Sequence, residues 1–318
     1  MLAFRYTHQG VSTTPEDYMA RHRIGGWLVL KNGEVATERY GMGNVPGSRW
    51  VSFSVAKSFT STLVGAALHE GKLDSLDRRC DSVVPALLGG GYEGTTVRQL
   101  LRMTSGVRWN EDYLDPNSDI AAFGDAVKLG RPGAVMAFMR ARPRAAAPGT
   151  RFNYNTGDTF VLGAVVSAVT GKTLCDYLSE RIWSRAGMEA DAYWMVEASG
   201  GQELAGGALN ATLRDYGRFG LLVMRDGVIG SQRVLPVGWR DLAGQPDTVL
   251  TASAGYGYQW WTLSGGAFIG KGLYGQYLFV HPAEGIVCVI FGAWFAPLNA
   301  SAESETLSLL AGVVDWLR

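Results

Sequence analysis

The sequence predicts an α+β fold in which both ends of the chain build one antiparallel sheet and an all-helical region is inserted between them. Two observations support this prediction. Short apolar or alternating runs, separated by turn residues, occur at 26–40 and again at 256–291. The segments between these runs have helical spacing instead. We therefore expect 1–68 and 205–318 to form one discontinuous α/β domain, and 69–204 to form a mainly helical domain.

The first predicted element is a β-hairpin. Residues 26–30 and 35–40 are typical of strands, and they are joined at Asn32-Gly33, the dipeptide most typical of tight hairpin turns. A helix is predicted to follow from Ser54. Its continuation to Leu68 is apolar on nearly every side, so we expect this helix to be buried.

Five further helices and three strands are predicted along the rest of the chain. The helices are expected at 95–103 (capped by Thr95 or Thr96), 161–169 (ending at Gly171), 175–186 and 213–224 (ending at Asp226-Gly227). The strands are expected at 256–263, 275–280 and 286–291, followed by a final helix at 302–317.

Composition limits the classes of function. The 318 residues are 47% hydrophobic, and 29 basic residues balance 29 acidic ones, so neither a nucleic acid nor an anionic membrane surface is indicated as a partner. Three cysteines stand far apart in apolar surroundings and four histidines form no cluster, which predicts buried free thiols and no metal site. We expect no membrane span and no leader segment, hence a cytoplasmic protein; a secreted protein trimmed of its leader would look the same.

The most informative pair of residues is Ser54 and Lys57, three positions apart on one face of the predicted buried helix. Burial lowers the pKa of a lysine amine, and a neutral amine within reach of a serine hydroxyl can take its proton. The alternative is a helix-capping serine followed by a solvated lysine. Of the six lysines in the chain, however, Lys57 alone has a serine three positions before it.

Ser-x-x-Lys is the first motif of the serine β-lactamases and penicillin-binding proteins, and the chain resembles their class C-type branch. That branch includes DD-peptidases, esterases and 6-aminohexanoate-dimer hydrolases. The resemblance implies a β-lactamase/DD-peptidase-like fold, with the active site between the two predicted domains. It extends to Pro148, Gly149, Phe152 and Tyr154, which match the family's second motif.

Tyr154 stands at the position of the family's catalytic tyrosine. A phenol beside a lysine ammonium has a lowered pKa and can relay a proton to the leaving group. Alternatively, its ring packs and its hydroxyl caps a turn. Thr156 stands where β-lactamases and peptidases usually have an asparagine that holds the substrate amide, and a hydroxyl residue there is more typical of the aminohexanoate-dimer hydrolases.

The third motif of the family, a strand carrying Lys/His-Thr-Gly, is expected within 268–276. If Gly272 is its glycine, the cationic position is Gly270, and the N–H of Leu273 joins that of Ser54 in an oxyanion hole. A register in which Lys271 is the cation, or a plain glycine-rich strand, remains open. Without a cation at this position, the site would favour substrates that lack a fixed carboxylate.

These observations predict a serine hydrolase that cleaves ester or amide bonds through an acyl-enzyme on Ser54, with Lys57 as base and Tyr154 as proton relay. Thr156, Gly272 and two aromatic residues of a loop over the cleft, Trp109 and Tyr113, are the predicted substrate contacts. Core or rim packing is the alternative role of the two aromatic residues. The expected partner is a small ester, amide or lactam, with no cofactor. A β-lactamase, a DD-peptidase and a non-catalytic sensor that stops at the acyl-enzyme are the alternatives.

Overall fold

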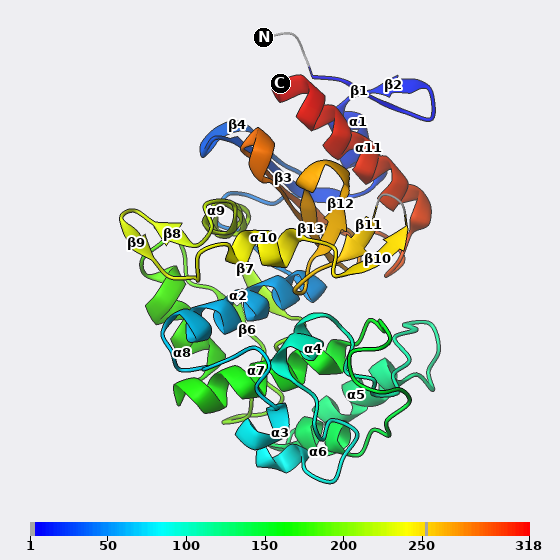
Figure 1. The fold of residues 1–318 in the computed structure, drawn as a ribbon. Coiled ribbons are helices and arrows are strands. Elements are labelled where there is room, and N and C mark those ends of the chain that lie inside the picture. The colour runs from blue at the N-terminus through cyan, green and yellow to red at the C-terminus, as the bar shows by residue number, and fades with distance from the viewer. Residues whose placement is uncertain (1–3, 252–253) are drawn as a thin grey trace.

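An eight-stranded antiparallel sheet forms the upper half of the molecule in the computed structural model, which describes residues 4–251 and 254–318 (Figure 1). Its strand order is β10-β11-β12-β13-β14-β15-β3-β4, so the hairpin of β3 and β4 from the first part of the chain pairs with β15 from the last part. The predicted antiparallel sheet made from both ends of the chain is confirmed. The strands are β3 Ile24–Lys31, β4 Glu34–Tyr40, β10 Thr248–Thr251, β11 Ala254–Tyr256, β12 Trp261–Leu263, β13 Phe268–Gly272, β14 Gln276–His281 and β15 Ile286–Gly292.

The predicted hairpin is the β3–β4 pair, and its turn is at Asn32-Gly33 as expected. Both turn residues have positive φ, 54° and 94°, which Asn and Gly tolerate better than other residues. Strand β3 is apolar without alternation because both of its faces are covered: Leu28 and Leu30 belong to one hydrophobic core, and Trp27 and Val29 to the other.

One predicted strand is wrong in extent. Residues 256–263 contain only the last residue of β11, then an irregular turn, and then β12. At this turn Gln259 has φ 64°, and its buried carboxamide donates to the carbonyls of Leu100 and Leu101 at 2.9 and 3.1 Å. The chain turns here because this side chain binds a helix of the other half of the molecule, which no local pattern reveals.

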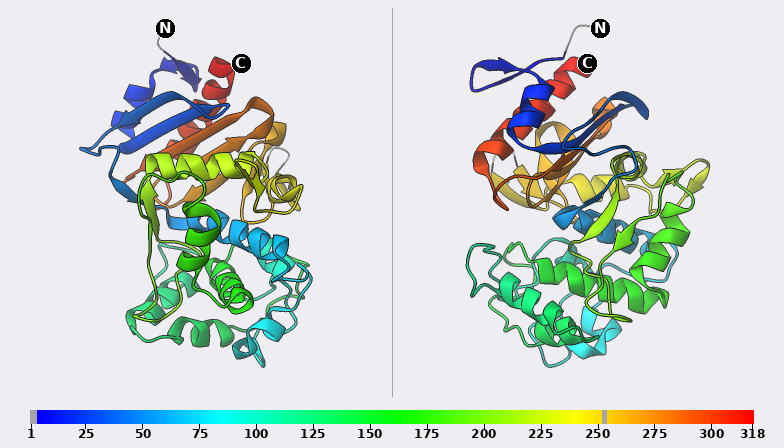
Figure 2. Two further views of the ribbon diagram at one scale, coloured as in Figure 1. Left: turned by 90° about the vertical axis from the view of Figure 1, so that its left-hand side faces the viewer. Right: turned by 180° about the vertical axis from the view of Figure 1, so that it is seen from behind.

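Helices cover both faces of the sheet. Helices α1 Pro15–Arg21 and α11 Ala300–Leu317 lie on the outer face, and α2 Ala56–His69 and α9 Leu213–Met224 lie on the inner face (Figure 2). Three small sheets complete the β structure: β1 Tyr6–His8 with β2 Val11–Thr13, β5 Arg49–Val51 with β7 Leu209–Thr212 and β6 Tyr193–Trp194, and β8 Val228–Ile229 with β9 Gln232–Arg233. Helix α10 Trp239–Gly244 lies next to the sheet.

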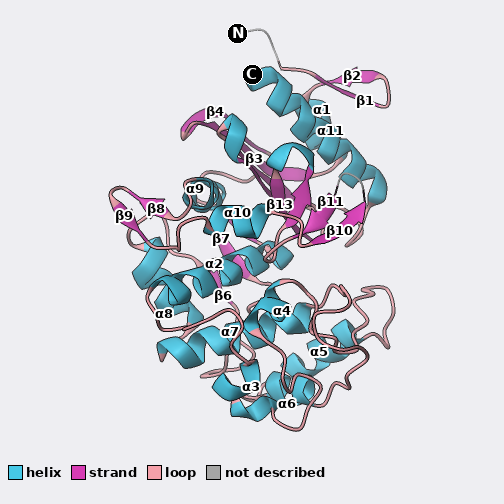
Figure 3. Cartoon of the chain, in the orientation of Figure 1, coloured by secondary structure: helices cyan, strands magenta, loops and turns pink. Residues whose placement is uncertain are grey.

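The remaining helices gather below α2, away from the main sheet (Figure 3). Several of their ends follow from the sequence: Thr96 and Gln99 form a capping box on α4, Asn155 caps α7, and Gly171 ends α7 with φ 67°. The members of this group are α3 Cys80–Val83, α4 Val97–Leu101, α5 Asp119–Lys128, α6 Ala134–Arg140, α7 Thr156–Thr170 and α8 Leu174–Leu178, which continues as a π-turn at Ser179–Trp183. The domain boundaries at 68/69 and 204/205 stay a prediction.

Helix α2 lies between the sheet and the helical group and is preceded by a 3₁₀ turn, η1 Phe53–Val55. Every residue of α2 from Ala56 to Ala67 is buried, as its uniformly apolar sequence predicted. It packs against α7 on one side, while η1 packs against β13 on the other. The sequence around Ser54 therefore lies where the two halves of the molecule meet.

One expectation about the cysteines is wrong. All three are free, and Cys80 and Cys288 are buried, but Cys175 is exposed. In α8 its neighbours Leu174 and Tyr177 face the core, which leaves Cys175 on the solvent side of the helix. Among the described residues no single helix is long and apolar enough to cross a membrane; α7 with 174–183 passes that test only as a pair bent by 71°.

Candidate active site

The Ser54 and Lys57 side chains meet at the start of α2. Ser54 lies in η1 and Lys57 in the first turn of α2, and Lys57 Nζ lies 2.9 Å from Ser54 Oγ. Lys57 is 1% exposed, so its alternative description as a solvated lysine does not apply. Phe53 has φ 44°, a conformation that sets the sharp entry of the chain into this helix.

Three oxygen atoms surround the Lys57 amine at the same distance. Nζ contacts Ser54 Oγ, Thr156 Oγ1 and the carbonyl oxygen of Gly206, each at 2.9 Å. Burial lowers the pKa of Lys57 to about 8, while the charge of Glu111 acts in the opposite direction. A substantial fraction of this amine is therefore neutral near pH 8 and has a lone pair available.

Tyr154 lies beside this pair, immediately before α7. Its ring centroid is 5.0 Å from Lys57 Nζ, and the ring stacks on Trp261 with centroids 5.4 Å apart. Burial and the charge of Glu111 raise the pKa of Tyr154 well above its ordinary value, against a hydrogen bond with Ser54 that lowers it. The lowered phenol pKa that we predicted is wrong, because burial and the charge of Glu111 outweigh the hydrogen bond with Ser54. The raised pKa means that the Tyr154 phenol keeps its proton at neutral pH.

These side chains open into a cavity of about 370 Å³. It is mainly apolar and aromatic, with three charged side chains, Glu111, Lys271 and Glu303. Such a lining suits an organic molecule with a few polar groups. The residues that line it are Ser54, Glu111, Tyr113, Tyr154, Trp261, Lys271, Gly272, Leu273, Tyr277, Trp294, Pro297, Leu298 and Glu303.

Strand β13 carries the candidate third motif along the edge of this cavity. Gly272 lies against η1: a Cβ added there would be 2.4 Å from the carbonyl oxygen of Ser52. A Cβ on Gly270 would meet Ser58 Oγ at 3.1 Å, so this position also faces η1 and α2. The two glycines thus lie on the same side of β13. This spacing is the one expected if Gly272 is the glycine of the third motif and Gly270 occupies its cationic position.

Lys271 points to the other side of β13 and reaches the cavity from there. Its Nζ forms an ion pair with Glu303 at 2.8 Å and lies 4.4 Å from the ring centroid of Trp261. The cation is therefore present near the site, but on the strand face that carries Ile269 and not on the face that meets Ser54.

The predicted substrate contacts fall into two groups. Tyr113 and Gly272 line the cavity, as does Leu273, the predicted second residue of the oxyanion hole. Trp109 and Thr156 are not among its lining residues. The indole of Trp109 is 6% exposed and donates to Glu111, while the Thr156 hydroxyl lies between Lys57 and Glu111.

Glu111 is a site residue that the sequence analysis did not single out. Its carboxylate accepts hydrogen bonds from Trp109 Nε1, from Tyr113 Oη at 2.5 Å, from the backbone N–H of Thr156 at 3.0 Å and from the Thr156 hydroxyl. One signal was available: Trp109 and Tyr113 flank Glu111 at two residues on each side, and alternate residues of an extended segment share a face.

Comparison with known proteins identifies the family of this chain. The family model described as Beta-lactamase matches residues 11–312. A 6-aminohexanoate-dimer hydrolase from Paenarthrobacter ureafaciens is 31% identical over 288 residues, which cover 85% of this chain and 73% of that protein. A structure from Bacillus anthracis, named as a candidate 6-aminohexanoate-dimer hydrolase, superposes with a TM-score of 0.86 at 26% identity and covers 99% of this chain and 85% of that one.

A penicillin-binding protein from Bacillus halodurans has the same fold, with a TM-score of 0.73, 20% identity and coverage of 93% of this chain and 99% of that one. The family match, the 6-aminohexanoate-dimer hydrolase relative and the buried Ser–Lys pair identify a serine hydrolase of the β-lactamase and penicillin-binding-protein class. The chain belongs to the Beta-lactamase family.

Proposed function

We propose that this protein hydrolyses small esters or amides through an acyl-enzyme on Ser54. The observation that carries the proposal is the buried Lys57 amine, 2.9 Å from Ser54 Oγ and with a pKa of about 8. The neutral amine takes the hydroxyl proton as Oγ attacks the substrate carbonyl carbon, so a C–O bond forms and Lys57 becomes an ammonium. The carbonyl π electrons move to the carbonyl oxygen, which becomes an oxyanion.

The backbone supports the second part of acylation. The N–H groups of Ser54 and Leu273, at the edge of the cavity, are the donors that we assign to the oxyanion. The oxyanion then re-forms the carbonyl and expels the leaving group, which takes a proton from the phenol of Tyr154. The Lys57 ammonium replaces the phenol proton. Deacylation reverses these transfers: a water molecule attacks the acyl carbonyl carbon while its proton passes through Tyr154 to Lys57. The tetrahedral intermediate then collapses, the bond between Ser54 Oγ and the acyl carbon breaks, and Lys57 returns the proton to Ser54 as the acid leaves.

Two features favour substrates without a fixed carboxylate. We assign the cationic position of the third motif to Gly270, which packs against α2, and the second motif has Thr156 in place of asparagine. The cavity is mainly apolar and aromatic. A linear amide of the kind cleaved by 6-aminohexanoate-dimer hydrolases, or an ester of similar size, fits these features, and the Paenarthrobacter ureafaciens relative carries that name.

A β-lactamase or DD-peptidase activity is the second candidate. It is favoured by Lys271, a cation that lines the same cavity and can meet a substrate carboxylate from the other side of β13. A sensor that stops at the acyl-enzyme is a third candidate, and it differs only in the rate of the water step.

A fluorophosphonate tests the nucleophile. The wild-type protein should gain one phosphonyl group on Ser54, located by mass spectrometry, and Ser54→Ala should gain none while its melting temperature stays close to that of wild type. The lost hydroxyl removes the hydrogen bond with Lys57, worth about 1 kcal/mol of stability. Labelling of another residue would remove Ser54 from the mechanism.

The substrate class is tested by kcat/KM for a p-nitrophenyl ester, nitrocefin and a linear aminohexanoate dimer on one preparation. We expect the short-chain ester to exceed nitrocefin. A higher value for nitrocefin would favour the β-lactamase candidate. One equivalent of nitrophenolate released in a burst, with no steady state after it, would identify a sensor.

A further inference from the structure

Four hydrogen bonds converge on Glu111, a carboxylate at the wall of the cavity. Two of its four donors belong to Thr156, the first residue of α7. A carboxylate accepts about four hydrogen bonds, so these donors leave little capacity for a substrate. The Glu111 carboxylate therefore binds side-chain and backbone groups of the protein and not a substrate, although it lines the substrate cavity.

Thr156 links Glu111 to Lys57. Its hydroxyl accepts from Lys57 Nζ at 2.9 Å and donates its single hydrogen to Glu111. The carboxylate is acceptor-only, and this fixes the direction of both hydrogen bonds. If Glu111 were absent, the hydroxyl would be free to donate to the lone pair of a neutral Lys57 amine.

The direction of these bonds decides where that lone pair points. A neutral lysine amine has two N–H hydrogens and one lone pair. Thr156 Oγ1 and the Gly206 carbonyl oxygen are both available only as acceptors, so they take the two hydrogens. The third contact, Ser54 Oγ, then faces the lone pair. Glu111 and Thr156 together aim the base at the nucleophile.

Charge gives a second link between the same residues. The ionisable groups next to Lys57 are Tyr154, whose ring centroid is 5.0 Å from Nζ, and Glu111, whose charge acts on the amine. On the helices that pack against α2, Asp158 of α7 accepts from Tyr92, and Tyr177 of α8 donates to Glu70 at the other end of α2. Of these, Glu111 is the group whose charge acts on Lys57, and it favours the ammonium form against the effect of burial.

We propose that Glu111 is a positioning residue of the reaction, which acts through the Thr156 hydroxyl to aim the Lys57 amine at Ser54 and stabilises the ammonium that forms when Ser54 loses its proton. This inference rests on the proposed function. It also gives a physical reason for a hydroxyl residue at position 156: a threonine relays between an amine and a carboxylate with one oxygen atom.

The test is the pH dependence of kcat/KM for an ester in Glu111→Gln. In wild type, kcat/KM should rise with pH as Lys57 loses its proton. Removing the negative charge lowers the pKa of Lys57, so the midpoint of this rise should move to lower pH, by about one unit. The plateau should fall about tenfold or more, because the amine is a weaker and less well-directed base.

Asp119→Asn is the matched control. Asp119 anchors the same loop by accepting from the backbone N–H of Asn110 at 2.8 Å and from Arg142 at 2.7 Å, but it does not act on Lys57. A loop defect alone would lower activity in both variants and leave the pH midpoint in place. An unmoved midpoint in Glu111→Gln, or an equal shift in both variants, would overturn the proposal.

The relay through the Thr156 hydroxyl is tested separately by substitutions of Thr156. These variants also test the proposed role of Glu111 if Glu111→Gln does not fold. Thr156→Val removes the hydroxyl and should lose about tenfold or more of the plateau rate. Thr156→Ser restores a hydroxyl and should recover most of this loss. Equal rates for the Val and Ser variants would refute the relay. If wild type hydrolyses no ester or amide at all, it is the proposed function that fails.

Discussion

At the scale of single residues, burial decides the chemistry of Lys57. A solvated lysine is an ammonium at neutral pH and cannot take a proton from serine. Enclosure in the first turn of α2 lowers the pKa to about 8, so the neutral amine is present in the range where enzymes usually work. Because the neutral form is the base, the rate of acylation should rise with pH through this value.

Lys57→Arg should abolish hydrolysis at every pH between about 6 and 10. A guanidinium keeps its charge throughout this range and cannot act as a base, although it retains hydrogen-bond donors for Thr156 and Gly206. The measurement is kcat/KM for a p-nitrophenyl ester across the range, together with far-UV circular dichroism to verify the fold. A rate that still rises with pH would mean that another group takes the proton from Ser54.

Tyr154→Phe should slow amide cleavage more than cleavage of an activated ester. An amine leaving group must be protonated to depart, whereas nitrophenolate departs without help. The phenylalanine ring keeps the stacking on Trp261, so packing is preserved. Rates for an anilide and a nitrophenyl ester of the same acid measure the difference. An unchanged anilide rate would return Tyr154 to a packing role, and equal losses would place it in the activation of Ser54.

The sequence could predict Ser54 and Lys57 as a pair because three residues along a helix bring them to one face. Tyr154 and Thr156 required the resemblance to a family, since almost a hundred residues separate them from Lys57. Glu111 was missed, although two aromatic residues flank it at alternate positions. Its role depends on Thr156 and Lys57 meeting it in space, which the sequence pattern does not show.

At the scale of elements, the site depends on how closely β13 approaches η1. Gly272 allows the approach, because any side chain at this position would collide with the carbonyl oxygen of Ser52. The same approach places Leu273 on the edge of the cavity that Ser54 lines. The distance between the two assigned oxyanion donors is thus set by the packing of a strand against a 3₁₀ turn.

Gly272→Ala should lower kcat by about tenfold or more, since its Cβ must push η1 away from β13 and separate the oxyanion donors. The strain should also cost about 1–3 kcal/mol of stability. Gly124→Ala is the control: Gly124 lies in α5 with open space around its Cβ position, and alanine is the better helix former there. Urea unfolding measures the free energy of unfolding of both variants, and ester kinetics measures their kcat. Full activity in Gly272→Ala would show that the approach is not needed.

Elements defined by local chemistry were predicted well. The Asn32-Gly33 turn fixes the β3–β4 hairpin, and the amphipathic run at 213–224 is α9 with the same bounds. The split between β11 and β12 was missed because the buried Gln259 side chain, not a local pattern, turns the chain. The register of β13 was likewise left open, because it depends on which face meets η1.

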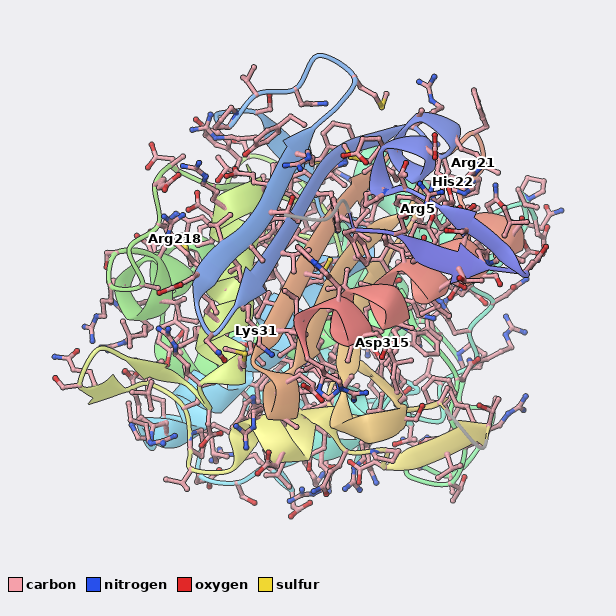
Figure 4. All side chains as sticks on the ribbon, turned by 90° about the horizontal axis from the view of Figure 1, so that it is seen from above. Arg5, Arg21, His22, Lys31, Arg218 and Asp315 are labelled. Carbon is pink, nitrogen blue, oxygen red and sulfur yellow. The ribbon has the colours of Figure 1, made fainter. Side chains whose placement is uncertain are left out.

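At the scale of the whole molecule, the two ends of the chain are joined by a buried carboxylate. Glu305 in α11 is 5% exposed and accepts from Tyr6 Oη at 2.8 Å, from Arg21 at 2.7 Å and pairs with His22 at 2.6 Å. Arg21 and His22, at the end of α1, are labelled in Figure 4 beside this helix. The sequence predicted that both ends share one domain, but not these partners, which lie some 280 to 300 residues away.

Glu305→Gln should lower the free energy of unfolding by about 2–3 kcal/mol at pH 7. Burial alone would raise the pKa of Glu305, but the hydrogen bonds from Arg21, His22 and Tyr6 outweigh it and lower the pKa from 4.5 to about 2. Since the folded pKa is lower than the unfolded one, this contribution is complete above about pH 4.5 and is lost as the pH falls towards 2.

Urea unfolding of wild type and Glu305→Gln at pH 7 and at pH 3 measures this dependence, and the difference between the two proteins should shrink at the lower pH. Glu16→Gln is the control, because Glu16 forms an exposed ion pair with Arg39 at 3.5 Å, worth less than about 1 kcal/mol. A difference between wild type and Glu305→Gln that stays constant with pH would attribute the loss to altered packing of α11 and not to the charge. Such a result would leave the junction of the two chain ends dependent on the apolar contacts of Tyr18 and Leu309.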